Sequence, residues 1–253
     1  MLIDTHTHLY LDKFQEDIDE VITRAVAEDV KMMLLPNIDS ATIDEVFKLA
    51  SKYPQCLPMV GLHPCSVKAN YKEELESLHA YLDRENVIAV GEIGMDLYWD
   101  KTFEKEQIEA FHIQLDWALD NDLPIVIHSR NAMQECINIV KDRQNGQLRG
   151  VFHCFDQNED TAKQIIDLDF YLGIGGVLTF KKSKLPEAIK KLPLDHIVIE
   201  TDSPFLTPTP FRGKRNESSY VKYVAEKMAE IFNKPVSIIA EITTGNAKRL
   251  FKI

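Results

Sequence analysis

Short, almost uninterrupted runs of apolar residues recur along this chain and most constrain the fold that it can adopt. Ile125-Val126-Ile127 and Ile197-Val198-Ile199 are typical examples. Such runs indicate parallel strands that are buried on both faces. We predict eight strands, at residues 1–5, 32–36, 57–62, 87–92, 124–128, 150–153, 170–175 and 196–202.

Amphipathic segments separate these runs. The segment after the fourth strand keeps the three-and-four spacing of a helix at Ile108, Phe111, Leu115 and Ala118. Other helices are expected at residues 15–29, 40–53, 71–85, 131–145, 158–168, 183–191 and 217–232. Pro235 is expected to open a last helix and Gly245 to close it.

Eight strands that alternate with helices in a chain of 253 residues predict an α/β fold, a (β/α)₈ TIM barrel. Such barrels carry their active sites at the rim formed by the C-terminal ends of the strands. A doubly wound open sheet is the alternative, but no glycine-rich dinucleotide fingerprint accompanies it. No linker, internal repeat or low-complexity tract divides the sequence, so we predict one domain over residues 1–253.

Composition and charge narrow the class of protein. An apolar content of 45% and a charged content of 27% are typical of a soluble globular protein. The four cysteines are scattered, which indicates reduced thiols, and neither a signal peptide nor a membrane helix is predicted, so we expect a cytoplasmic protein. The net charge of −11 argues against a protein that coats nucleic acid, but it allows a nuclease that acts on one end of a strand.

Histidines and acids stand at the ends of the predicted strands. His6 and His8 end the first strand two residues apart, so both side chains point to the same side. Converging imidazoles are a common start to a metal site. Further strand ends carry groups of the same type, namely His63, Glu92, His128, His153 and Asp202. Because these ends share one rim of a barrel, we predict a metal-dependent active site there.

The mixture of imidazoles and carboxylates predicts two divalent ions, with Mg, Mn and Zn as the candidates. We expect His6, His8 and Asp202 to hold one ion. His128 and His153 are expected to complete the site of the other ion.

Four acidic residues receive specific roles in this prediction. Glu92 would bridge the two ions, because the two oxygens of a carboxylate can bind two metals, whereas an imidazole cannot span them. A water held between the ions becomes hydroxide near neutral pH, and Asp202 is also the predicted general base. By strand parity, Asp4 lies on the side of His6 and Glu200 on the side of Asp202, so both are expected to hold the outer N–H of a ligand histidine. The alternative is that they bind backbone or a buried basic group.

Basic residues gather in the loops after the last two predicted strands. They are Lys181, Lys182, Lys184, Arg212, Lys214 and Arg215, and Arg130 follows the fifth strand. Any one of them could be solvated surface, but two clusters on one rim of an acidic protein indicate a funnel for phosphate. We therefore expect Arg130, Lys181 and Arg215 to bind substrate, and exonuclease-like action on single strands or strand ends.

With these residues in view, the chain resembles the TatD family of metal-dependent deoxyribonucleases, within the amidohydrolase-like barrels. The resemblance runs nearly end to end. Its carriers are Ile3-Asp4-Thr5-His6-Thr7-His8, Gly61-Leu62-His63-Pro64, Gly91-Glu92-Ile93-Gly94-Met95-Asp96, Ile127-His128-Ser129-Arg130, His153-Cys154-Phe155, Gly173-Ile174-Gly175-Gly176, Glu200-Thr201-Asp202-Ser203-Pro204-Phe205-Leu206 and Arg212-Gly213-Lys214-Arg215-Asn216-Glu217. It implies one hydrolase barrel that cleaves DNA phosphodiesters with divalent metals held by the same six ligands, and it places His63 at the substrate phosphate.

Two positions depart from the family pattern. Ser218 stands where the family often has proline, and Asp156-Gln157 stands where it usually has Ser-Gly. Neither position is a ligand, but Asp156 adds a negative charge to a loop on the active face.

Other functions remain as alternatives. An ester or amide hydrolase of the same superfamily, such as a D-aminoacyl-tRNA deacylase, is the main one, although Glu92 in place of a carboxylated lysine favours the nuclease branch. A non-catalytic metal-binding scaffold is a second alternative, but it would leave the predicted general base Asp202 without a role. A glycosidase is a third, but it would explain none of the histidines. We expect DNA as the substrate, and neither a membrane nor an obligate protein partner.

Overall fold

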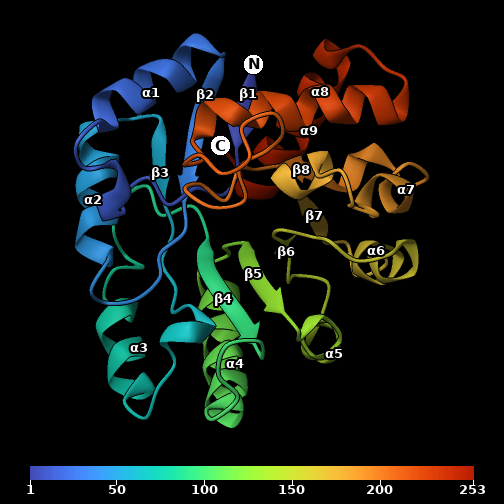
Figure 1. The fold of residues 1–253 in the computed structure, drawn as a ribbon. Coiled ribbons are helices and arrows are strands. Elements are labelled where there is room, and N and C mark those ends of the chain that lie inside the picture. Colours follow the sequence, from blue (N-terminus) through green and yellow to red (C-terminus); the bar gives the residue numbers. More distant parts are fainter. The chain divides into compact units, whose positions relative to one another are not determined.

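The computed structural model describes residues 1–253 and confirms the predicted alternation of strands and helices (Figure 1). The strands are β1 (Leu2–Asp4), β2 (Val30–Leu35), β3 (Cys56–Pro58), β4 (Val90–Asp96), β5 (Ile125–Arg130), β6 (Gly150–Phe152), β7 (Tyr171–Ile174) and β8 (Ile197–Ile199). The helices are α1 (Ile18–Ala27), α2 (Ile43–Lys52), α3 (Tyr71–His79), α4 (Glu104–Asp120), α5 (Met133–Arg143), α6 (Glu159–Ile166), α7 (Leu185–Ile189), α8 (Val221–Phe232) and α9 (Val236–Phe251).

The residue contacts divide the chain into two compact units. Unit 1 comprises Met1–Leu35 and Cys154–Ile253, and unit 2 comprises Pro36–His153. The expectation of a single domain over residues 1–253 stays a prediction. No helix is both long enough and apolar enough to cross a membrane.

Unit 1 brings the start of the chain beside the segment that follows β8. β1 pairs with β2 and β7 pairs with β8, and both pairs are parallel. Beyond β1, the Thr5 N–H donates to the Ile199 carbonyl at 3.1 Å, and the Asp202 N–H donates to the His6 carbonyl at 2.9 Å. Residues far apart in sequence therefore lie on adjacent backbone segments.

The C-terminal helix α9 packs against β1 and β8. Pro235 precedes α9 as predicted, but the expected end at Gly245 is wrong, because the helix continues to Phe251. The last turns continue because they are part of the core: Phe251 is buried, and the buried Asn246 amide donates to the Ile197 carbonyl at 2.8 Å. Burial thus outweighs the weak helix propensity of one glycine.

Unit 2 contains a parallel sheet in the order β4, β5, β6. β4 is buried along its whole length, and Figure 1 shows β4 and β5 side by side with α4 alongside. The pairing shifts within β4, because Gly91 faces Val126 whereas Ile93 already faces Ile127. Glu92 is therefore the extra residue of a bulge, a feature that re-aims a side chain.

Asn37 satisfies the backbone at this bulge. Its N–H donates to the Gly91 carbonyl at 3.0 Å, and its carbonyl accepts from the Glu92 N–H at 3.1 Å. The Asn37 side chain also donates to the Gly61 carbonyl at 2.9 Å, two residues before His63. One asparagine thus fixes the backbone of two predicted site residues.

Gly94 allows β4 and β5 to approach closely, and it provides a test of this sheet. Its φ is 127°, and a Cβ atom there would lie 2.2 Å from the His128 carbonyl oxygen. We expect Gly94→Ala to lower the free energy of unfolding by about 3 kcal/mol or more, because a strained backbone and a clash coincide. Urea denaturation measures this change.

Gly245→Ala is the matched control, because a Cβ there meets nothing within 4 Å. Alanine in the interior of α9 should raise the free energy of unfolding by about 1 kcal/mol. Wild-type stability of Gly94→Ala would contradict the described pairing of β4 with β5.

Candidate metal-binding clusters

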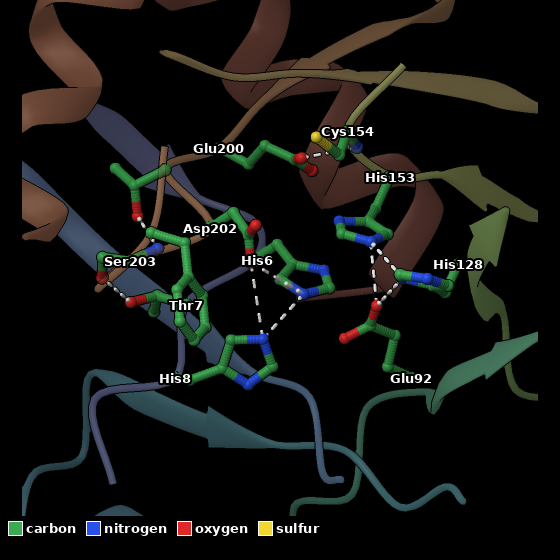
Figure 2. A network of polar contacts seen from close by, with 12 residues as sticks. His6, Thr7, His8, Glu92, His128, His153, Cys154, Glu200, Asp202 and Ser203 are labelled. Atoms are coloured by element: carbon green, nitrogen blue, oxygen red, sulfur yellow. Dashed lines mark hydrogen bonds and ion pairs between the residues drawn. The ribbon is translucent and has the colours of Figure 1, made fainter. Parts of the chain in front are cut away.

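His6, His8 and Asp202 form a cluster in unit 1, which we call the His6 cluster (Figure 2). The Nε2 atoms of His6 and His8 are 3.3 Å apart. Oδ1 of Asp202 lies 3.8 Å from the first and 3.5 Å from the second. Both imidazoles are buried, whereas the Asp202 side chain keeps 15% of its surface exposed.

The donor set of the His6 cluster fits a divalent ion. A tetrahedral ion about 2.0–2.1 Å from each of two imidazole nitrogens separates them by roughly 3.3 Å, as is observed here. Two imidazoles and one carboxylate suit zinc and manganese. The prediction that these three residues come together is therefore supported by their geometry within unit 1.

Local hydrogen bonds aim the ligand atoms of this cluster. The His8 N–H donates to the Ser203 carbonyl at 2.8 Å, which holds the strand end against the segment that carries Asp202. The Tyr10 hydroxyl lies 2.8 Å from His8 Nδ1, so Nε2 is the atom left facing Asp202. Asp202 itself adopts a φ of 53°, which aspartate tolerates better than most residues. Tyr10 was not predicted, although parity places it on the side of His8.

Asp4 hydrogen-bonds the segments that carry His6 and Asp202, and its predicted contact with the outer N–H of a ligand histidine stays a prediction. Its carboxylate accepts from the Thr201 N–H at 2.9 Å, from the Thr201 hydroxyl at 2.7 Å and from the His6 N–H at 3.4 Å. Burial raises the pKa of Asp4 to about 7, against the effect of hydrogen bonds from Ser218, Thr201 and His6. The contacts correspond to the backbone alternative, and they fasten the two segments that carry the ligands.

Glu200 also contacts backbone, since its Oε1 accepts from the Cys154 N–H at 2.6 Å. Cys154 has a φ of 50°, a conformation that needs local support for a residue other than glycine. Glu200 therefore holds a turn of unit 1 in place. Its predicted action on a ligand histidine stays a prediction.

The second group, in unit 2, surrounds one oxygen of Glu92, and we call it the Glu92 cluster. His128 Nδ1 and His153 Nε2 each lie 2.8 Å from Glu92 Oε1, and the two nitrogens are 3.4 Å apart. His63 Nε2 lies 3.4 Å from the same oxygen. The Glu92 side chain is only 3% exposed. Figure 2 shows the rings of His128 and His153 turned toward the carboxylate.

Glu92, His128 and His153 therefore fit a second cation on the same grounds. A buried carboxylate and two imidazole nitrogens 3.4 Å apart repeat the donor chemistry of the His6 cluster. The ligand-type atoms of His63, Glu92 and His128 also lie close together, but the hydrogen bond that His63 Nδ1 accepts from the Cys65 N–H sets His63 apart from the proposed ligands. The role of Glu92 as a bridge between two ions stays a prediction.

A backbone hydrogen bond determines which nitrogen of the neutral His63 ring carries the hydrogen. The Cys65 N–H donates to His63 Nδ1 at 3.0 Å, so the neutral ring carries its hydrogen on Nε2. An Nε2–H is a donor and not a metal ligand. This tautomer agrees with a contact to an anionic substrate, which stays a prediction for His63.

Asp96 completes the Glu92 cluster and was not predicted. Its Oδ2 lies 2.8 Å from His128 Nε2, on the ring edge opposite Glu92. Burial opposes ionisation, but the hydrogen bond with His128 and the N–H groups of Trp99 and Tyr98 hold the pKa of Asp96 well below its usual range. Burial likewise opposes the charged form of His128, while Asp96 and Glu92 raise its pKa. A carboxylate behind a ligand histidine is the usual second partner at a metal site.

The basic residues that were predicted to bind substrate differ in whether an acidic side chain pairs with them. Arg215 is paired with Asp17, through Nη1 at 2.7 Å and Nη2 at 2.6 Å, and it also donates to the Lys13 carbonyl. Its charge is therefore compensated, which weakens the prediction that it binds phosphate. Lys181 is exposed. Arg130 is exposed as well and lies over an aromatic ring instead of a carboxylate.

Proteins of similar sequence and fold indicate the class of this protein. The solved structure of the TatD homologue YjjV from Escherichia coli K12 has a TM-score of 0.94 at 30% identity, and the match covers 100% of this chain and 98% of that one. The uncharacterized metal-dependent hydrolase YabD of Bacillus subtilis (strain 168) is 42% identical over 254 residues, which is 100% of both chains. The predicted α/β class and (β/α)₈ TIM-barrel fold are confirmed by these relatives, and the class of protein is a metal-dependent hydrolase.

A family model described as TatD related DNase matches residues 3–252. The chain belongs to the TatD family. A further relative is the 3'-5' ssDNA/RNA exonuclease TatD of Salmonella typhimurium (strain LT2), which is 28% identical over 258 residues and matches 100% of this chain and 99% of that protein.

The contact of Asp96 with His128 can be tested by metal binding. We expect Asp96→Asn to weaken the affinity for Zn²⁺ by about 10–100-fold, the usual cost of losing an outer carboxylate partner. Competition with a chromophoric chelator measures the affinity.

Asp44→Asn is the matched control. Asp44 is also a hydrogen-bonded carboxylate of unit 2, but it accepts from the Tyr81 hydroxyl, at 2.8 Å. It should bind Zn²⁺ as the wild type does. Equal affinity of wild type and Asp96→Asn would show that Asp96 does not support a metal ligand.

Proposed function

We propose that the protein is a metal-dependent deoxyribonuclease that hydrolyses phosphodiester bonds at the ends of single-stranded DNA. The observation that carries the proposal is the pair of largely buried clusters, each with two imidazoles and one carboxylate within 3.8 Å of one another. The named activity of the Salmonella relative and the description of the family model support the choice of nucleic acid.

The proposed cofactors are two divalent ions, with Mg²⁺, Mn²⁺ and Zn²⁺ as the candidates. His6, His8 and Asp202 would hold one ion, and Glu92, His128 and His153 would hold the other. When bound, such ions act as Lewis acids that lower the pKa of water and offset the charge of a phosphate.

The chain's own residues then supply the proton transfers and the binding of substrate. Asp202 would accept the proton of the attacking water, and it is the more exposed member of its cluster. His63 would donate its Nε2 hydrogen to a phosphate oxygen, in line with its tautomer. Arg130 and Lys181 would attract the strand, while Arg215 would act mainly through its pair with Asp17.

The acidic charge of the molecule favours action on strand ends. With a net charge of −11, long stretches of DNA are repelled, so only a locally positive surface can bind phosphate. A single strand also presents its phosphates and bases without a partner strand.

Digestion of end-labelled oligonucleotides tests the proposed reaction. We expect shortening in the presence of Mn²⁺ or Mg²⁺, none with excess chelator, and a loss of about 100-fold or more in kcat for Asp202→Asn, the scale of general base catalysis. Asp195→Asn is the control, because Asp195 is an exposed acid before β8, at the opposite end of this strand. Release of amino acid from D-aminoacyl-tRNA in place of DNA cleavage would contradict the proposal and favour the ester hydrolase.

The contribution of Lys181 can be tested by salt dependence. We expect Lys181→Glu to raise KM for single-stranded DNA and to lower the slope of log affinity against log salt by about 0.7, the value for one phosphate contact on a single strand. Lys234→Glu, an exposed lysine in the turn between α8 and α9, should leave both unchanged. An unaltered KM and salt slope in Lys181→Glu would show that Lys181 does not bind the strand.

A further inference from the structure

The two most exposed large apolar side chains of the chain stand next to each other at the end of β4. Trp99 is 68% exposed and Tyr98 is 51% exposed, more than any other large hydrophobic residue. Exposed aromatic rings forgo the free energy of burial. Adjacent exposed rings therefore indicate a surface that meets a ligand.

Hydrogen bonds fix the backbone that carries these rings. Asp96 Oδ1 accepts from the Tyr98 N–H at 3.0 Å and from the Trp99 N–H at 3.2 Å. The Leu97 N–H donates to the Arg130 carbonyl at 2.9 Å, which continues the pairing of β4 with β5. The rings meet edge to face with centroids 4.8 Å apart. The aromatic pair is thus held by the sheet and is not a loose loop.

The same side chain, Asp96, connects the rings to the Glu92 cluster. While its Oδ1 binds the N–H groups of Tyr98 and Trp99, its Oδ2 lies 2.8 Å from His128 Nε2. One carboxylate therefore separates the exposed rings from a proposed metal ligand. A group resting on Trp99 would lie one side chain away from the proposed chemistry.

Arg130 adds a cation that no carboxylate neutralises. Its guanidinium lies 4.0 Å from the ring centroid of Tyr98 and 5.2 Å from that of Trp99. Arg24 and Arg215, in contrast, are both paired with acids. A guanidinium that lies over a ring and not against a carboxylate keeps its N–H groups available for phosphate oxygens.

An arginine on aromatic rings is not by itself a binding site. Arg84 lies over Tyr81 at 4.1 Å and over Phe47 at 4.9 Å, yet these residues belong to α2 and to the segment after α3, and Tyr81 bonds Asp44. Arg130 differs in two respects. It lies near the exposed Trp99 ring, and the Asp96 carboxylate links this aromatic pair to His128.

We propose that Trp99 is a stacking platform for the base next to the cleaved phosphodiester, with Arg130 on the adjoining phosphate and Tyr98 as the support of Arg130. This inference rests on the proposed nuclease function and names the part of the substrate that unit 2 binds. A base of a single strand has a free face for stacking, whereas an internal base of a duplex is stacked on both faces. Because every base has an aromatic face, the platform binds without sequence preference.

Kinetics with a modified substrate test the platform. We expect Trp99→Ala to raise KM by roughly tenfold, the scale of one base–aromatic stack, with kcat nearly unchanged because the stack forms before and during the reaction. Trp99→Phe should recover most of the loss. An abasic residue at the terminal nucleotide should raise KM for wild type by a similar factor and should have no further effect on Trp99→Ala.

Arg130→Ala should also raise KM and reduce its salt dependence, while Arg84→Ala, which disrupts the comparable stack on Tyr81, should behave as wild type. Equal losses in Arg130→Ala and Arg84→Ala would overturn the role given to Arg130.

A binding measurement separates this inference from the proposed reaction. The chain has two tryptophans, and Trp117 is only 7% exposed, so Trp117→Phe leaves Trp99 as the sole tryptophan, whose emission is excited selectively over that of tyrosine. With Mg²⁺ present, a phosphorothioate oligothymidine that resists hydrolysis should quench this fluorescence, and an abasic oligomer should not.

The outcomes are distinguishable. Digestion by wild type without quenching, and with an unchanged KM in Trp99→Ala, would overturn the platform and leave the nuclease proposal standing. Quenching without digestion would support the platform while contradicting the proposed reaction. The absence of both would overturn both.

Discussion

The chemistry proposed for this protein depends on buried carboxylates that face imidazole nitrogens at short range. Glu92 Oε1 has two such nitrogens at 2.8 Å while its side chain is 3% exposed. A buried carboxylate is costly unless a positive partner compensates for lost water. Neutral imidazoles supply only lone pairs or one hydrogen each, so a divalent cation among them satisfies both the acid and the rings. Asp202 is less buried, with 15% of its side chain exposed, but a cation beside it in unit 1 would satisfy its carboxylate and the His6 and His8 rings in the same way.

Two carboxylates outside the proposed ligand set keep this geometry in place. Asp4 binds the backbone of the segments that carry His6 and Asp202, and Asp96 binds the ring of His128. Each acid is buried, and each fixes a strand end together with the chain next to it. In unit 2, Asp96 also connects the site to an exposed aromatic surface, because it accepts hydrogen bonds from the Tyr98 and Trp99 N–H groups while it contacts His128.

The sequence was sufficient to predict the alternation of strands and helices, because apolar runs indicate buried strands. The predicted fourth strand, residues 87–92, was placed too early, since β4 runs from Val90 to Asp96 and Glu92 lies inside it. The sequence was less informative where a feature depends on one unusual backbone position. The bulge at Glu92 shifts the register of β4, and no pattern of residue types marks it. Asp96 was missed because the predicted strand stopped at Glu92, whereas β4 continues to Asp96. The expected helix end at Gly245 was wrong because burial of the last turns of α9 outweighs the weak helix propensity of glycine. Arg215 pairs with Asp17, a contact between distant residues that the sequence does not show, and its binding of substrate stays a prediction.

The most direct test of the central claim is anomalous diffraction from crystals grown with Zn²⁺, recorded on both sides of the zinc absorption edge. The account predicts one peak about 2.0–2.1 Å from the nitrogens of His6 and His8 and a second at the same distance from those of His128 and His153. Peaks elsewhere, with these imidazoles and acids contacting only one another, would contradict it.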